Sequence, residues 1–342
     1  MSSRDVSRPI CLVGLGLIGG SLMRDLAGGT QAVYGFNRST SGARAAAKEG
    51  YDVSDDLVAT LQRAEADGAM IVIAVPMHAV ANVLDNIIEH APTCGITDVV
   101  SVKKPVYDLI RERGLETRYV GGHPMAGTEK SGWSASQEGL FHRAAWVITY
   151  DYALEKEQAG EPVPAEWIDL FSDVCRMAVG VKAEAVPASV RKHDEAVGRI
   201  SHLPHVIAEA LSIVGDEGGT LSQSLAAGSF KDATRVAGTA PELVRAMCET
   251  NAAALVYSLD QMIELLTKAR NDLDSDSPNI AELVDAGHRA HTRMEARSGA
   301  RRESVSPVKI SSRPVMRLHP GGHNWVRQLV QAESLGGRIE VF

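Results

Sequence analysis

The feature that most constrains the fold is a glycine-rich segment near the start of the chain. The apolar run ICLV at 10–13 leads directly into GLGLIGGSL, in which Gly14, Gly16 and Gly19 have the spacing GxGxxG. A short strand that turns through such glycines into an apolar helix is typical of the first βα turn of a dinucleotide-binding fold. The glycines permit a tight turn, a close approach to a pyrophosphate, and close packing of helix on strand. The segment predicts a cofactor site made by Gly14, Leu15, Gly16, Leu17, Ile18 and Gly19.

The next two apolar runs extend this predicted cofactor site. AVYGF ends at Asn37, Arg38 and Ser39, where an acidic residue would select NAD. None is present, and a guanidinium beside hydroxyls suits a ribose 2'-phosphate. We therefore expect NADP to be favoured over NAD, with stacking of Arg38 on adenine as the alternative interpretation. The run MIVIAVP ends in residues suited to a wall beside the cofactor, namely Ala74, Val75 and Pro76.

The order of apolar and helical patterns divides the 342 residues into three parts. Up to residue 150, short apolar runs, among them DVVSV at 98–102, alternate with helical segments, which predicts a mainly parallel sheet covered on both faces. Alanine-rich helical patterns follow a charged break at 151–165. One helix is expected to start at the capping-box spacing of Thr239 to Glu242 and to continue to about Ala269. We expect an α/β Rossmann-type domain over 1–165, an all-α substrate and dimerisation domain over 166–300, and a tail over 301–342 that forms a small βαβ element or a partner-binding arm.

Composition narrows the classes of partner. A net charge of −8 argues against nucleic acid, whose phosphates need a basic face. The four cysteines lie far apart without a CxxC pair, which favours reduced thiols in the cytoplasm. No apolar stretch reaches the ~20 residues that cross a bilayer, so no membrane partner is expected. His319 and His323 flank a Pro-Gly-Gly turn without an acidic neighbour, and we expect no metal site.

Four further segments narrow the prediction of function: SVKKPV at 101–106, GGHPMAGTEKSG at 121–132, and the pair RISHLPH at 199–205 and GSFKDATR at 228–235. Together with GLGLIGGSL they resemble the prephenate/arogenate dehydrogenase family over roughly residues 10–297. The resemblance implies an NAD(P)-dependent oxidoreductase of tyrosine biosynthesis. Its reaction would remove a hydride and CO2 from prephenate or arogenate and give 4-hydroxyphenylpyruvate or tyrosine. Both substrates carry the same ring, hydroxyl and carboxylate, so the choice between them stays open.

The resemblance and the chemistry together suggest catalytic residues. His123 follows a strand and a Gly-Gly turn, so it should project at the carboxyl edge of the sheet. A neutral imidazole there can take the hydroxyl proton as hydride leaves. The alternative is a histidine that only hydrogen-bonds its loop. Ser101, expected to follow another strand, would hold the same hydroxyl or orient His123, and would also lie against the cofactor.

The resemblance also implies a set of substrate-binding residues. Arg235 would bind the ring carboxylate through its planar fork, with Asp232 one helical turn earlier to orient it; an exposed surface pair is the alternative. His205 would face the substrate side chain after a kink at Pro204, whereas His202 could equally be a core histidine. Glu129 would gate entry or meet the ammonium group of arogenate. Gly228 opens the segment that holds Arg235, and Lys103 and Lys231 are alternative cations for the carboxylate.

Two other functions stay open from sequence. One is another dehydrogenase with a Rossmann front and helical back, of the β-hydroxyacid dehydrogenase or imine reductase type, and the other is an NADP-binding redox sensor. Both leave the histidine segment GGHPMAGTEKSG unexplained. The apolar helices between residues 187 and 297 predict a homodimer. Many bacterial members of the family carry a fused mutase or a regulatory ACT domain, and the tail is shorter than either, so we expect it to mediate assembly.

Overall fold

The computed structural model describes residues 6, 8–128, 130–298 and 313–342 of the chain. These residues form two compact units. The first contains the chain up to Asp194 together with Val315–Phe342, and the second is Glu195–Pro314. The first unit is therefore built from two separate stretches of sequence. Because the relative placement of the two units is not defined, each is described by itself.

The first unit is organised around a parallel sheet with the strand order β3-β2-β1-β4-β5-β6. This order is that of a doubly wound dinucleotide-binding fold, whose strand sequence reverses between β1 and β4. The elements are β1 (Ile10–Val13), α1 (Leu17–Leu26), β2 (Val33–Phe36), α2 (Thr40–Lys48), β3 (Val53–Ser54), α3 (Leu57–Asp67), β4 (Met70–Ile73), α4 (Met77–His90), β5 (Gly95–Asp98), α5 (Lys104–Glu112), the 3-10 turn η1 (Glu116–Arg118) and β6 (Tyr119–Val120).

Both faces of this sheet are covered, as the sequence predicts. Along β1, Ile10 and Leu12 belong to one apolar core, and Cys11 and Val13 belong to a second core on the other face. Successive side chains of a strand point to opposite faces, so a fully apolar strand must be buried twice. All four residues are fully buried. The predicted α/β Rossmann-type front is confirmed.

A second, smaller sheet of the first unit has the order β7-β8-β9. Strand β7 is antiparallel to β8, and β8 is parallel to β9. The tail adds a parallel pair, β10 with β11, and β11 lies beside β9. The elements are β7 (Gly122–Pro124), the 3-10 turn η2 (Trp133–Ala135), β8 (Ala145–Ile148), α6 (Asp151–Ala159), α7 (Ala165–Gly180), β9 (Glu184–Pro187), α8 (Val190–Val197), β10 (Val315–Leu318), α15 (Trp325–Leu335) and β11 (Arg338–Val341).

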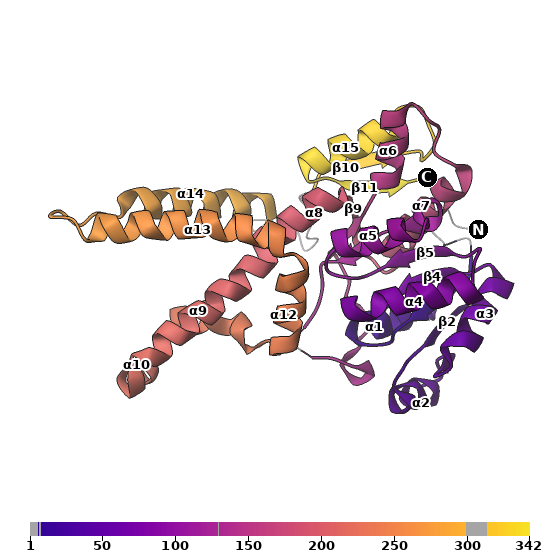
Figure 1. Ribbon diagram of the computed structural model, residues 1–342, viewed down its shortest axis with the longest axis horizontal. Coiled ribbons are helices and arrows are strands. Elements are labelled where there is room, and N and C mark those ends of the chain that lie inside the picture. Colours follow the sequence, from indigo (N-terminus) through magenta and orange to yellow (C-terminus); the bar gives the residue numbers. More distant parts are fainter. Residues whose placement is uncertain (1–5, 7, 129, 299–312) are drawn as a thin grey trace, which may run out of the picture. The chain divides into compact units, whose positions relative to one another are not determined.

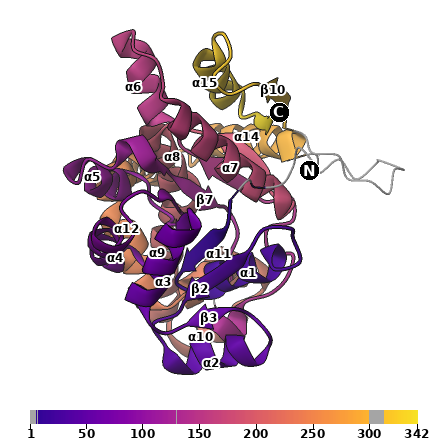
Figure 2. The same cartoon turned by 90° about the vertical axis from the view of Figure 1, so that its right-hand side faces the viewer.

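Residues 315–342 of the tail lie beside α6 and α7 within the first unit (Figures 1 and 2). Its helix α15 carries Glu333, whose carboxylate accepts hydrogen bonds from the Tyr150 hydroxyl at 3.0 Å and from the Ser189 amide at 2.6 Å. Lys192 on α8 forms an ion pair with the same carboxylate at 2.9 Å. Glu333 therefore connects the tail to the end of β8 and to the start of α8.

The first unit extends further than the boundary after residue 165 that the sequence suggests. Helix α7 packs on β6 and on β9, and its Trp167 indole donates a hydrogen bond to the Tyr119 carbonyl at 2.9 Å. Trp167, Leu170 and Phe171 are buried in the same core as β1. An apolar helix that covers the sheet in this way belongs to the unit that contains the sheet.

The second unit is helical in all its described elements. It contains the π-helical turn η3 (Gly198–His202), α9 (Leu203–Glu217), α10 (Gly219–Leu225), α11 (Gly228–Thr234), the 3-10 turn η4 (Arg235–Gly238), α12 (Pro241–Thr250), α13 (Ala252–Leu273) and α14 (Ala281–Ser298). Figure 1 shows α13 and α14 running side by side, and Lys268 of α13 pairs with Glu282 of α14 at 2.8 Å. The predicted helical back half is confirmed.

Two local predictions are wrong. The single helix expected from Thr239 to about Ala269 is two helices, because the backbone leaves the helical conformation at Asn251, where φ is −113° and ψ is 30°. Its first helix is capped by Ala240 without a side-chain hydrogen bond, so the capping box of Thr239 is absent. The strand expected at 98–102 is instead β5 at Gly95–Asp98. It ends there because the Asp98 carboxylate accepts a hydrogen bond from the Val100 amide at 2.8 Å and turns the chain.

Candidate functional site

The glycine turn between β1 and α1 forms the predicted dinucleotide cradle. Gly14 has a φ of +103°, and a Cβ there would lie 2.6 Å from the Ala74 carbonyl oxygen. A Cβ on Gly19 would lie 2.0 Å from the Gly14 carbonyl oxygen, so only glycine permits this packing of helix on strand. A Cβ on Gly16 would meet nothing within 4 Å, so the backbone at the start of α1 has open space beside it. The turn therefore fits a dinucleotide whose pyrophosphate approaches the helix N-terminus.

The other residues predicted for the cradle fall into two groups. Leu15 is buried in the core, and Ile18 packs partly against it, so both would contact a cofactor through the backbone. Leu17 begins α1, directly after the Gly16 cap. Val75 approaches Gly14, since its Cγ1 would be 2.9 Å from a Cβ on that glycine, and Pro76 caps α4. The ends of β1 and β4 thus meet where the sequence places the cofactor.

The residues predicted to contact the cofactor ribose lie at the end of β2. Ser39 caps α2 by accepting the Gly42 amide at 3.2 Å, and its hydroxyl contacts that of Ser41 at 2.9 Å. The Asn37 side chain accepts the Ser39 amide at 3.4 Å. Arg38 is exposed, and within the described part of the chain it forms no ion pair. Its guanidinium is therefore available to an anion.

The catalytic candidates of the first unit lie at the carboxyl end of the sheet. Ser101 is exposed, three residues after β5. A Cβ on Gly122 would lie 2.6 Å from the Asp98 carbonyl oxygen, so β7 starts against the end of β5. His123 is the next residue of β7 and pairs with Val147 of β8. The structure therefore places His123 at the edge where open α/β folds bind ligands.

A second histidine contacts His123. The His123 Nδ1 lies 2.8 Å from the Nε2 of His193, which is on α8 and nearly fully buried. The His193 Nδ1 lies 2.7 Å from Asp194 Oδ1. The backbone amides of Lys103 and Lys104 donate to the two oxygens of Asp194, each at 2.8 Å. Sequence reasoning missed this pair, because its only signal is an adjacent His-Asp within a short helix.

A buried ion pair between Lys103 and Asp98 supports the carboxyl end of the sheet next to His123. Lys103 is fully buried, and its ammonium group donates to Asp98 and, at 2.7 Å, to the Gly122 carbonyl. The Tyr119 hydroxyl donates to Asp98 Oδ2 at 2.6 Å. Because Lys103 holds the residue before His123, it is a structural cation. Its alternative role as the partner of a substrate carboxylate is wrong.

In the second unit, the segment RISHLPH contains a π-helical turn. Residues Gly198–His202 have π geometry, and Pro204 follows within the first turn of α9. Such turns are frequent at functional sites. His202 is buried and its Nδ1 lies 3.1 Å from the Asn251 amide, so it is a core histidine. His205 is partly buried, and its Nδ1 donates to the Ser201 carbonyl at 2.9 Å.

The segment GSFKDATR forms α11 and the start of η4, and both pack against α9. Gly228 begins α11, and a Cβ there would meet nothing within 4 Å. Arg235, Asp232 and Lys231 are exposed. No ion pair joins Asp232 to Arg235 in the described part of the chain, so the expected orienting contact is absent. Both side chains point to solvent within this unit, and Arg235 remains available to an anion.

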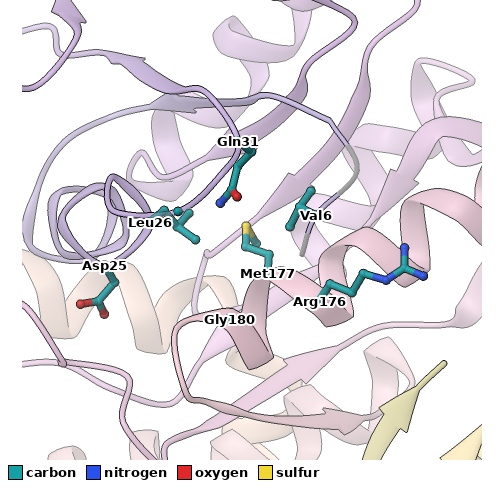
Figure 3. Close-up of a pocket in the computed structure, with 8 residues that line it drawn as sticks. Val6, Asp25, Leu26, Gln31, Arg176, Met177 and Gly180 are labelled. Atoms are coloured by element: carbon teal, nitrogen blue, oxygen red, sulfur yellow. The ribbon is translucent and has the colours of Figure 1, made fainter. Parts of the chain in front are cut away.

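Glu129 lies outside the described residues. Among the residues that the structure covers, no group of three or more potential ligands could hold a metal ion. A hollow of about 90 Å³ near the end of α1 is lined by Leu26, Gln31 and Met177, while Arg176 extends away from it (Figure 3). It contains none of the predicted site residues and is too small for a dinucleotide. Nor is any described helix both long and apolar enough to span a membrane.

These observations establish the class of protein to which the chain belongs. A doubly wound sheet with a glycine cradle at its switch point, and an imidazole at its carboxyl edge, is the architecture of a dinucleotide-dependent enzyme. Comparison with known families supports this class. Residues 21–162 match the nucleotide-binding domain of prephenate dehydrogenase, and residues 189–286 match its dimerization domain.

Individual relatives give the same result. Prephenate dehydrogenase of Bacillus subtilis is 31% identical over 95% of this chain and 85% of its own. A crystal structure from Corynebacterium glutamicum, described as a candidate prephenate dehydrogenase, is 55% identical, with a TM-score of 0.91 over 99% of this chain and 100% of that one. Prephenate dehydrogenase from Aquifex aeolicus, solved with hydroxyphenyl propionate and NAD+, is 25% identical, with a TM-score of 0.70 over 84% of this chain and 98% of that one. The chain belongs to the prephenate dehydrogenase family and is an NAD(P)-dependent oxidoreductase.

Proposed function

We propose that this enzyme catalyses the oxidative decarboxylation of prephenate, arogenate or both, and yields 4-hydroxyphenylpyruvate or tyrosine. The observation that carries this proposal is the position of His123, at the carboxyl edge of the sheet that holds the glycine cradle. The B. subtilis relative is a prephenate dehydrogenase, and the Aquifex relative was solved with a hydroxyphenyl compound and NAD+. Both relatives support a substrate whose ring becomes a hydroxyphenyl group.

The cradle at Gly14, Gly16 and Gly19 would hold the dinucleotide, with Ala74 and Val75 beside it. When bound, the nicotinamide supplies the hydride acceptor. His123 takes the proton of the substrate hydroxyl as the C–H bond breaks, and Ser101 holds the same hydroxyl in place. Loss of CO2 then makes the ring aromatic. The proton on His123 returns to the same oxygen to give the phenol, so the overall reaction releases no net proton.

The second unit contributes the residues proposed to bind the substrate. Arg235 is exposed and forms no ion pair with the residues that the structure describes, and a guanidinium binds a carboxylate through two parallel hydrogen bonds. His205 keeps its Nε2 as an acceptor, because its Nδ1 donates to Ser201, and this suits a contact with the substrate side chain. Gly228, Asp232 and Glu129 complete the proposed set.

Two finer features are also proposed. NADP is favoured over NAD, because exposed Arg38 with the hydroxyls of Ser39 and Ser41 suits a 2'-phosphate and no acidic residue stands at the end of β2. The enzyme is a homodimer formed through the second unit, as the match to a dimerization domain supports.

Steady-state rates on prephenate and on arogenate, each with NAD and with NADP, test the reaction. We expect turnover of at least one substrate, followed as reduced nicotinamide at 340 nm with release of CO2. His123→Asn should bind the dinucleotide normally but lower kcat by roughly 10²- to 10⁴-fold. Arg235→Lys should weaken either substrate roughly tenfold to a hundredfold, because an ammonium group lacks the bidentate fork. The absence of turnover on both substrates with both cofactors would refute the proposal.

A further inference from the structure

The feature that carries a further inference is the chain of contacts from His123 through His193 to Asp194. Within one unit, two imidazoles and a carboxylate are joined by hydrogen bonds of 2.8 and 2.7 Å. The two rings meet at 74° with their centroids 5.1 Å apart, so one ring nitrogen points at the edge of the other ring. Such a chain fixes which nitrogen of each ring carries a proton.

The chain starts at Asp194. Burial opposes the charge of this carboxylate, but hydrogen bonds from His193 and from the amides of Lys103 and Lys104 keep the pKa of Asp194 below its usual value. An ionised carboxylate only accepts hydrogen bonds. The His193 Nδ1 must therefore carry a proton and donate it to Asp194 across 2.7 Å.

The next step is the charge of His193. Burial lowers the pKa of His193, and the ammonium of Lys103 lowers it further, whereas Asp194 and Asp98 act in the opposite direction. The ring is consequently neutral at neutral pH. A neutral imidazole with its proton on Nδ1 has a lone pair on Nε2. The His193 Nε2 therefore accepts the hydrogen bond across the 2.8 Å contact.

We propose that His193 is a positioning residue that holds His123 in the tautomer required of a general base. The His123 Nδ1 carries the proton and donates it to His193, so the lone pair of His123 is on Nε2. The opposite tautomer would have N–H on Nε2 and could not take a proton there. This inference rests on the proposed function of His123 as the base.

The arrangement also suits the second half of the proposed step. When His123 takes the hydroxyl proton on Nε2, it becomes an imidazolium with a proton on both nitrogens. Its Nδ1–H still donates to His193, so this hydrogen bond does not have to rearrange during proton transfer. The negative charge of Asp194, one ring away, favours this cation.

The test is the tautomer of His123 in the full-length enzyme labelled with [15N]histidine. Two-bond 1H–15N correlation spectra at pH 8 distinguish a ring protonated on Nδ1 from one protonated on Nε2. The His123 signals are those that disappear in His123→Asn. We expect Nδ1–H in the wild type. His193→Phe should move His123 mainly to the Nε2–H form and lower kcat roughly ten- to a hundredfold.

Two further variants separate positioning from packing. His193→Gln places an amide oxygen near the former Nε2 and should keep both the His123 tautomer and most of the activity. His142→Phe replaces an exposed histidine of the same unit and should change neither. If His193→Phe fails to fold, the wild-type spectrum alone decides, since an Nε2–H tautomer of His123 overturns the inference.

The outcomes distinguish this inference from the proposed function. An unchanged His123 tautomer in folded His193→Phe overturns the positioning role, whatever happens to the rate. A changed tautomer with an unchanged rate supports positioning by His193 but removes His123 as the base. A changed tautomer with a reduced rate that His193→Gln restores supports both.

Discussion

At the scale of single residues, the proposed preference for NADP depends on Arg38. Its guanidinium is exposed after β2, beside the hydroxyls of the α2 N-terminus. Removal of a cation that pairs with a 2'-phosphate costs about 1.5–3 kcal/mol. Arg38→Ala should therefore raise KM for NADP roughly tenfold or more and leave KM for NAD nearly unchanged.

The matched control is Lys48→Ala, which removes an exposed cation from the other end of α2. It should leave both KM values unchanged. Equal effects of Arg38→Ala on the two cofactors would instead assign Arg38 to adenine stacking. A wild-type enzyme that uses NAD alone would show that no 2'-phosphate site exists.

Sequence alone could place some of these residues and not others. The cradle glycines and His123 stand in motifs whose spacing fixes their position relative to a strand end. His193 could not be found in this way, because its contact with His123 spans 70 residues and depends on how α8 packs. The sequence identifies Lys103 as a cation, but its complete burial against Asp98 follows only from the fold.

At the scale of elements, the start of α6 contains a carboxylate that weakens the fold at neutral pH. Asp151 accepts the Val190 amide at 2.9 Å, yet burial raises its pKa from 3.8 to about 6. The folded state therefore binds more protons than the unfolded state between about pH 4 and 6, and stability falls as pH rises through this window. Above it the cost is on the order of 3 kcal/mol at most.

Asp151→Asn keeps the acceptor for Val190 and removes the charge. Its melting temperature should match that of the wild type below about pH 4, exceed it increasingly between about pH 4 and 6, and exceed it by a constant amount from about pH 6 to about pH 8, as measured by circular dichroism. Asp55→Asn, the same change at an exposed loop position, should show no such divergence. A constant difference at all pH values would mean that the charge of Asp151 is not responsible.

The limits of sequence reasoning at this scale have local causes. The end of β5 cannot be placed from sequence, because the residues directly after Asp98 are apolar, while the side chain of Asp98 turns the backbone. The sequence around the helix break at Asn251 contains no proline or glycine that would predict the break. It follows from the burial of Asn251 against His202, a contact between segments 49 residues apart.

At the scale of the whole molecule, the second unit leaves much apolar surface uncovered. Leu266 on α13 is 53% exposed, and Ile213, Leu221 and Leu225 are exposed still further. Large exposed apolar surface usually marks an interface. The proposed homodimer would bury it, since a symmetric partner presents the same surface.

Leu266→Asp should therefore raise the dimer dissociation constant on the order of a hundredfold, because it buries an unpaired charge. Thr267→Asp adds the same charge at the adjacent exposed position and should have a much smaller effect. Sedimentation velocity between about 0.1 and about 50 µM, roughly the concentration range in which a weakened dimer dissociates, resolves the two species. A wild-type protein that sediments as a monomer throughout would contradict the homodimer.

The discontinuity of the first unit bears on the order in which the protein is made. A ribosome synthesises β9 and α8, then all of the second unit, and only afterwards the strand, helix and strand that hold Glu333 against Ser189. The helical unit can thus emerge and fold while the unit before it is still incomplete. Until Glu333 arrives, the start of the helix that carries His193 lacks that anchor. A nascent chain stalled after residue 314 would therefore have its dinucleotide cradle well before this anchor of its catalytic edge.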